Sequence, residues 1–86
     1  MRIPIIAYEF RHAEYAAREI LKLRPTEYTV IKDDFDNLLR SLQRGSEIFL
    51  VVAVRHIPSE RQRQQREAIL QICKVREFQI RELFLP

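Results

Sequence analysis

The sequence predicts a three-layer α/β domain built around a four-stranded, mostly parallel sheet. Short apolar segments alternate with segments of helical periodicity along the 86 residues. One segment, Ile48 to Val54, is continuously apolar, which is typical of a strand buried on both faces of a parallel sheet. The segments between the strands are long enough for the crossovers that parallel strands require.

The first part of the chain is expected to form a strand, a helix and a second strand. Ile3 to Tyr8 is an apolar, β-prone run in which Pro4 is tolerated near the strand start. Apolar residues then recur at helical spacing from about Arg11 to Arg24, which predicts a helix. Pro25 ends this helix because its ring cannot continue the hydrogen-bond ladder, and Tyr28 to Ile31 follows as the second strand.

A second helix is expected between the second and third strands. Asp33 or Asp34 is suited to cap its N-terminus, because a short carboxylate accepts hydrogen bonds from the free backbone N–H groups there. Its core face would consist of residues spaced along one side of a helix, namely Phe35, Leu38, Leu39 and Leu42. Gly45, the only glycine in the sequence, lies where a helix ends on a left-handed residue.

The third helix begins with a capping signal and carries its apolar residues in its second half. Ser59 and Gln62 have the spacing of a capping box, and the helix is expected to run to about Glu77. The residues that can face a core follow its first two turns and are Ala68, Ile69, Ile72, Cys73 and Val75. Phe78 to Leu85 forms the last strand.

The resulting order of elements is βαβαβαβ. Because crossovers between parallel strands are almost always right-handed, this order predicts a doubly wound sheet of the Rossmann or flavodoxin-like type. The first and third strands are the most apolar and are expected in the centre, which gives the strand order 2-1-3-4. The first helix would then lie alone on one face of the sheet, and the incomplete cover of that face predicts a homodimer.

The composition is that of one folded domain, residues 1–86, with 47% apolar and 31% charged residues. A single cysteine excludes a disulfide framework and a cysteine-rich zinc site. No apolar run is long enough to span a membrane, and the N-terminus has no signal-peptide pattern, so the chain is expected in the cytoplasm without a membrane partner.

The net charge of +3 arises in the second half of the chain, where eight basic residues outnumber five acidic ones. Much of this excess lies around the predicted start of the third helix, and a helix N-terminus favours phosphate. The pattern predicts a non-enzymatic module that grips nucleic-acid backbone or an acidic protein partner. The expected contact residues lie on this helix start and at the carboxyl edge of the sheet: Arg11, Arg55, His56, Ser59, Arg61, Arg63 and Arg66.

Other functions remain open from the residues alone. Glu9 with Asp33 and Asp34 could hold Mg²⁺ in a phosphoryl-transfer enzyme or nuclease, although both aspartates are also explained as helix caps. His12 and His56 could form an acid–base pair. A structural or regulatory interaction domain is the remaining alternative. No glycine-rich loop follows the first strand, so no cofactor is expected.

A set of consecutive segments also suggests a family. It comprises Ile6 to Tyr8, the leucine-rich run Phe35 to Gly45, the buried strand Ile48 to Val54, and Arg55 directly after it. In these segments the chain resembles the catalytic domain of the serine recombinases (the resolvase/invertase family), which has an active-site arginine at the position of Arg55. The resemblance implies a related fold. It does not imply recombinase activity, because Glu9 to His12 stands where the nucleophilic serine should follow the first strand.

Overall fold

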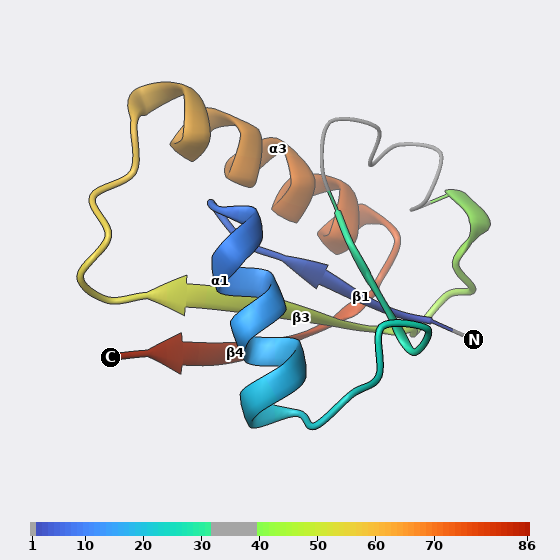
Figure 1. The fold of residues 1–86 in the computed structure, drawn as a ribbon. Helices are drawn as coiled ribbons and strands as arrows, with labels where there is room; N and C mark the ends of the chain where they lie inside the picture. Colours follow the sequence, from blue (N-terminus) through green and yellow to red (C-terminus); the bar gives the residue numbers. More distant parts are fainter. Residues whose placement is uncertain (1, 32–39) are drawn as a thin grey trace.

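Four strands form one sheet in the computed structural model, which describes residues 2–31 and 40–86 (Figure 1). They are β1 (Ile3–Ile6), β2 (Tyr28–Val30), β3 (Glu47–Ala53) and β4 (Gln79–Leu85). Every neighbouring pair is parallel, and the order is β2-β1-β3-β4. The predicted fold class and strand order are therefore confirmed, and this sheet is parallel throughout.

β1 and β3 lie in the centre of the sheet because both of their faces are apolar. Ile5 and Ile6 of β1 are at most 2% exposed, and Ile48 and Val51 of β3 are at most 1% exposed. β1 leads to β2 on one side, whereas β3 leads to β4 on the other side. The topological switch point therefore falls between β1 and β3.

The connection from β1 to β2 is a short helix that lies against one face of the sheet (Figure 1). α1 spans Phe10–Tyr15 and continues as a π-helical turn, η1 (Ala16–Ile20). The helical residues that meet the sheet are small, which lets the helix approach the strands closely. They are Ala13, Ala16 and Ala17, all fully buried.

This first helix is shorter than the sequence pattern predicts. The backbone of Lys22 is left-handed, with φ of 56°, and the N–H of Leu23 donates to the carbonyl of Ala17 at 2.8 Å. These two features close the helix before Pro25 is reached. The prediction that the helix continues to Arg24 is therefore wrong.

The connection from β3 to β4 is α3 (Glu60–Val75), which lies on the opposite face of the sheet (Figure 1). Ile69 and Cys73 are buried in the core on that face. Ala68 and Val75 are exposed, contrary to the prediction. Successive residues of an α-helix point about 100° apart, so neither side chain points in the same direction as the buried Ile69 and Cys73. Ala68 therefore lies beside Ile69 outside the core, and Val75 lies on the far side from Cys73.

The first half of the second predicted helix lies outside the described residues. Its proposed caps, Asp33 and Asp34, and most of its proposed core face lie outside the described residues. Leu42 packs against the core on the α3 face. Gly45 has φ of 81°, which confirms the left-handed residue predicted there.

The described elements form three layers, with α1 and η1 on one face of the sheet and α3 on the other. A hydrophobic core lies on each face. Among residues 2–31 and 40–86, no helix has the length and apolar character needed to cross a membrane.

Candidate anion-binding site at the sheet edge

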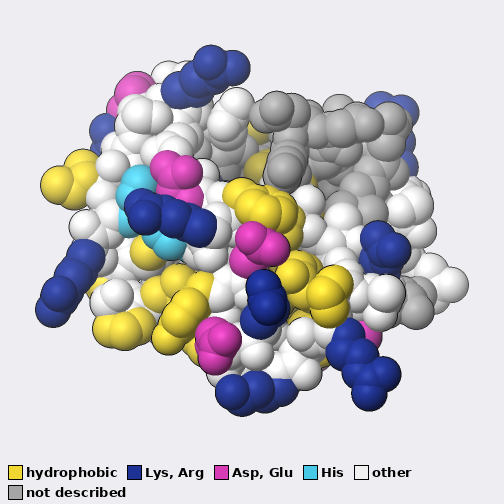
Figure 2. Space-filling view, in the orientation of Figure 1, with side chains coloured by type: hydrophobic (Ala, Val, Ile, Leu, Met, Phe, Trp, Pro, Cys, Tyr) yellow, Lys and Arg dark blue, Asp and Glu magenta, His cyan; other side chains and the backbone are white. Residues whose placement is uncertain are grey.

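The carboxyl ends of β1 and β3 bring together side chains that are distant in the sequence. The loops after these two neighbouring strands leave in opposite directions, which is where parallel sheets open a crevice for ligands. His12, near the start of α1, and His56, in the loop after β3, have ring centroids 5.3 Å apart. Figure 2 shows the two histidines at one place on the surface, with a Lys or Arg side chain lying over them.

Arg11 and Arg55 line a pocket of about 690 Å³ together with these two histidines. Both arginines are exposed and have no hydrogen-bond or ion-pair partner among the described residues. Tyr15, which is 53% exposed, lines the same pocket. The remaining walls are mostly apolar, and no Asp or Glu side chain of the described segments contributes to them. We call this the arginine–histidine pocket.

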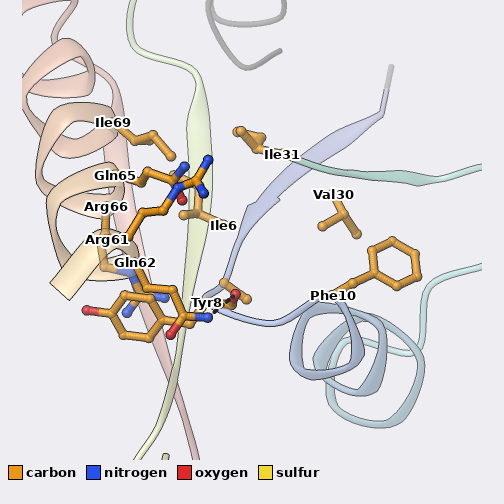
Figure 3. A pocket seen from close by; sticks show the side chains of 11 residues that line it. Ile6, Tyr8, Phe10, Val30, Ile31, Arg61, Gln62, Gln65, Arg66 and Ile69 are labelled. Atoms are coloured by element: carbon orange, nitrogen blue, oxygen red, sulfur yellow. Dashed lines mark hydrogen bonds between the residues drawn. The ribbon is translucent and has the colours of Figure 1, made fainter. Parts of the chain in front are cut away.

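A second pocket, of about 440 Å³, lies between the ends of β1 and β2 and the start of α3 (Figure 3). Arg61 extends over it from the first turn of α3 and is also exposed, without a partner in the part of the chain that is described. Much of the wall is apolar and includes Ile6, Ile31 and Ile69. Counting the described residues, this pocket therefore offers one free cation, whereas the arginine–histidine pocket offers two.

Arg66 lines the second pocket but is buried rather than displayed on the surface. It is only 8% exposed, and its Cζ lies 3.4 Å from the centroid of the Tyr8 ring. Its Nη2 donates to the carbonyl of Val51 at 3.2 Å, while its buried Nε has no hydrogen-bond partner in the described structure. Burial lowers the pKa of this guanidinium, although a neighbouring Tyr8 favours the charge.

The position of Arg66 corrects one expectation from the sequence. Arg63 and Arg66 are both predicted as contact residues from the sequence, but only Arg63 is exposed. Arg63 is also held by Glu60, whose Oε2 accepts from Nη2 at 2.6 Å. Among the described residues, the free charge at this edge is therefore carried by Arg11, Arg55 and Arg61.

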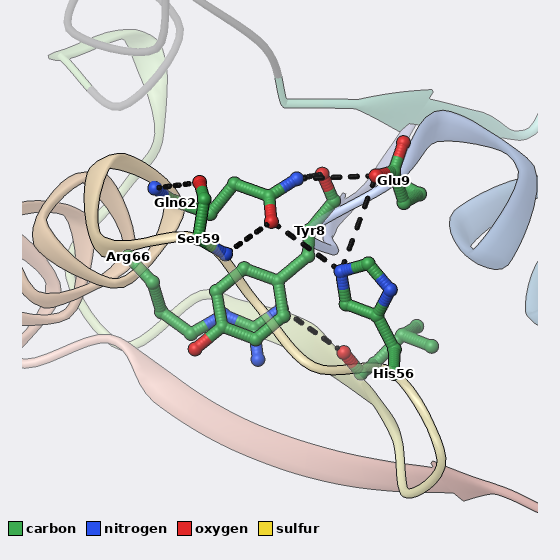
Figure 4. A network of polar contacts seen from close by, with 7 residues as sticks. Tyr8, Glu9, His56, Ser59, Gln62 and Arg66 are labelled. Atoms are coloured by element: carbon green, nitrogen blue, oxygen red, sulfur yellow. Dashed lines mark hydrogen bonds and ion pairs between the residues drawn. The ribbon is translucent and has the colours of Figure 1, made fainter.

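Gln62 joins the start of α3 to the end of β1 (Figure 4). Ser59 and Gln62 form the predicted capping box: Ser59 Oγ accepts from the Gln62 N–H at 3.1 Å, and Gln62 Oε1 accepts from the Ser59 N–H at 2.9 Å. Gln62 Nε2 also donates to Glu9 Oε1 at 3.1 Å and to the Tyr8 carbonyl at 3.3 Å. Gln62 thus stabilises the start of α3 and also holds that helix against the segment that follows β1.

His56 lies on the same network. Its Nε2 is 3.3 Å from Gln62 Oε1 and 4.0 Å from Glu9 Oε1. The same Gln62 Oε1 also accepts the hydrogen bond from the Ser59 backbone N–H, which fixes the amide. The fixed amide in turn holds the His56 imidazole in place between the two pockets. Glu9, the only acidic residue in this network, is engaged by Gln62 and His56.

His12 is in an environment that disfavours its charged form. Burial is the largest cause that lowers its pKa, followed by the positive charge of Arg11 and the proximity of His56. Glu9 acts in the opposite direction, and Arg66 lowers the pKa further. At neutral pH the His12 imidazole is therefore mainly neutral between cationic neighbours.

The magnesium alternative finds no support in the described residues. Asp33 and Asp34 lie outside them, and no group of three or more His, Cys, Asp or Glu residues elsewhere is arranged to hold a metal ion. Cys73 is a core residue: it is fully buried, and burial raises the pKa of its thiol. In the part of the chain that the structure describes, the arginines and histidines are the groups gathered at this edge.

Sequence reasoning missed two contributors to the site. Tyr15 lies three residues after His12 and four after Arg11, a spacing that places all three on one side of a helix. That signal was available in the sequence. The bonds from Gln62 to Tyr8 and Glu9 span more than 50 residues, and no local pattern could indicate them.

No protein-family model, curated protein or solved structure matches this chain. The resemblance to serine recombinases therefore stays a prediction, and the function has to be argued from the site itself.

Proposed function

We propose that the chain is a non-enzymatic nucleic-acid-binding module that grips the sugar–phosphate backbone of a single strand at the carboxyl edge of its sheet. The observation that supports this is the convergence of three exposed arginines from three different segments, none of which has a partner among the described residues. Arg11 comes from α1, Arg55 from the loop after β3 and Arg61 from the first turn of α3. The Gln62 network connects the elements that carry them.

Free arginines suit this role because a guanidinium forms paired hydrogen bonds with phosphate oxygens. An arginine already paired with a carboxylate would have to break that pair first. Arg11, Arg55 and Arg61 have no such partner in the described residues, whereas Arg63 is bound to Glu60. The edge thus offers positive charge that a phosphate backbone can neutralise.

An acidic protein surface would be attracted by the same arginines, but the aromatic residue favours nucleic acid. Tyr15 exposes about half of its side chain in the pocket that Arg11 and Arg55 line. An exposed ring beside cations allows a base to stack while its phosphate is bound, and stacking of this kind tolerates any base. A single strand, whose bases are accessible, is therefore the preferred form.

Binding of a fluorescent single-stranded oligonucleotide, followed by anisotropy, tests this proposal. Three phosphate contacts give a slope of about −2 for the logarithm of affinity against the logarithm of salt concentration. Each of Arg11→Ala, Arg55→Ala and Arg61→Ala should reduce that slope by about 0.7. Arg76→Ala is the matched control, since Arg76 is exposed at the other end of α3.

The proposal fails if the oligonucleotide does not bind at low salt, or if Arg76→Ala weakens binding as much as the three edge variants. Preference for an acidic protein such as a polyglutamate chain over the oligonucleotide would also contradict it.

We also infer that two copies associate through β4. This strand forms one edge of the sheet, so the backbone groups on its outer side are available to another strand. Phe84, near the end of β4, is 61% exposed, and its neighbour across the β3–β4 pair is Val52. A second copy is the partner that this edge fits, because pairing would extend the sheet and place another strand beside Phe84.

A further inference from the structure

The arginine–histidine pocket concentrates more positive charge than one backbone phosphate requires. Arg11 and Arg55 contribute two permanent charges, and His12 can add a third when it is protonated. A phosphodiester in the middle of a strand carries one negative charge. A phosphate monoester carries about −1.5 to −2 at pH 7 and matches this set of groups better.

The two histidines are placed to respond to such a ligand. Their rings touch edge to face, with centroids 5.3 Å apart, so a charge on one opposes a charge on the other. The groups that act on His12 are Arg11 and Glu9 near the start of α1, His56 from the loop after β3, and Arg66 from α3. A bound dianion would offset the cationic neighbours and allow His12 to take up a proton.

The rest of the pocket is suited to the group attached to the phosphate. Tyr15 is half exposed, and Ile57, which is 90% exposed, lines the same pocket. Ala53 and Leu85 contribute further apolar surface. A flat base next to the phosphate can cover these side chains, whereas inorganic phosphate cannot. The size of about 690 Å³ is in the range of pockets that hold small ligands.

We propose that the arginine–histidine pocket binds the terminal phosphate monoester of a nucleic-acid strand, with the terminal base against Tyr15. This inference rests on the proposed nucleic-acid-binding function and names the group that the edge recognises. Arg11 and Arg55 hold the phosphate oxygens, and His12 and His56 form the wall of the pocket beside them. Arg61, which lines the other pocket, contacts the strand away from its end.

The test compares three oligonucleotides of one sequence that differ only in the group at an end: a 5′-phosphate, a 3′-phosphate, or hydroxyls at both ends. A terminal phosphate at one of the two ends should tighten binding by about tenfold or more, as expected for an added charge-assisted hydrogen bond. Arg55→Ala should abolish this advantage, since Arg55 is exposed and its removal does not disturb packing. Arg61→Ala is the control and should weaken all three oligonucleotides equally.

A second readout uses pH. The advantage of the phosphorylated strand should be larger at about pH 6.5 than at about pH 8.5, because protonation of His12 beside the bound dianion adds positive charge. His12→Gln, which cannot be protonated but suits a helix, should flatten this dependence. The melting temperature of each variant shows whether the fold is retained.

The possible outcomes separate the two proposals. If all three oligonucleotides bind equally well, the pocket does not recognise a terminal phosphate, while backbone binding stands. If a nucleoside monophosphate binds in a manner sensitive to Arg55→Ala but no oligonucleotide does, the pocket is supported and the proposed function is wrong. If neither the monophosphate nor any oligonucleotide binds, both are wrong.

Discussion

Arg66 is a buried cation that the described structure leaves without a carboxylate partner. Its charge is stabilised by the face of the Tyr8 ring and by the carbonyl of Val51. Its Nε has no hydrogen bond, so part of the desolvation cost is not recovered. The long aliphatic part of the side chain also packs where the first two turns of α3 hold no apolar residue.

Packing, rather than charge, is therefore expected to be the main contribution of Arg66 to stability. Arg66→Ala should lower the free energy of unfolding by about 2–4 kcal/mol, because it leaves a cavity beneath Tyr8. Arg66→Met keeps most of the volume and removes the unpaired Nε, so it should cost less than about 1 kcal/mol. Urea denaturation measures both values. Equal losses for Ala and Met would show that the guanidinium charge is what stabilises the fold.

The environment of Arg66 shows where prediction from sequence stops at the level of residues. Arg61, Arg63 and Arg66 look alike in the sequence, and all lie near a helix start. Only the position of the sheet decides that Arg61 is exposed and that Arg66 points under Tyr8. A charged residue is expected on the surface by default. Arg61 and Arg63 are exposed as expected, whereas Arg66 is buried.

At the level of elements, the start of α3 is the part of the fold on which the site depends. Gln62 completes the capping box and bonds the Glu9 carboxylate and the Tyr8 carbonyl. It therefore joins two elements that carry free arginines. Loss of Gln62 should loosen both the helix end and the edge of the sheet.

Gln62→Ala is expected to lower the free energy of unfolding by about 1–2 kcal/mol, the range of lost caps and buried polar contacts. Gln65→Ala is the matched control on the next turn and should stay within about 0.5 kcal/mol, since Gln65 is exposed. Thermal and urea unfolding measure the difference. If the two variants lose the same stability, the bonds from Gln62 to Tyr8 and Glu9 do not contribute.

The elements themselves were predictable where one local signal dominates. The continuous apolar run identifies β3, and the spacing of Ser59 and Gln62 identifies the first turn of α3. The end of the first helix was not predictable, because a lysine has no intrinsic preference for the left-handed backbone that Lys22 adopts. Tertiary contacts impose that conformation, and they leave no trace in the local pattern.

At the level of the whole molecule, the strand order follows from few facts. Right-handed crossovers and two strongly apolar strands are enough to place β1 and β3 in the centre. This order also locates the crevice, because the switch point must lie between them. Which side chains line the crevice depends on the direction in which each one points. His12 and His56 come into contact there, whereas Arg63 points to Glu60.

The order also leaves β4 at an edge, and this gives a prediction about assembly. The chain of 10.4 kDa should elute with twice that mass at high micromolar concentration in gel filtration with light scattering. Phe84→Lys should shift it to the monomer mass, because a charge at this exposed position opposes burial in a paired edge. Val75→Lys is the matched control: Val75 is 77% exposed but comes before the start of β4, whereas Phe84 is near the end of that strand, so the mass should not change. A monomer at every concentration, or equal effects of the two lysines, would contradict association through β4.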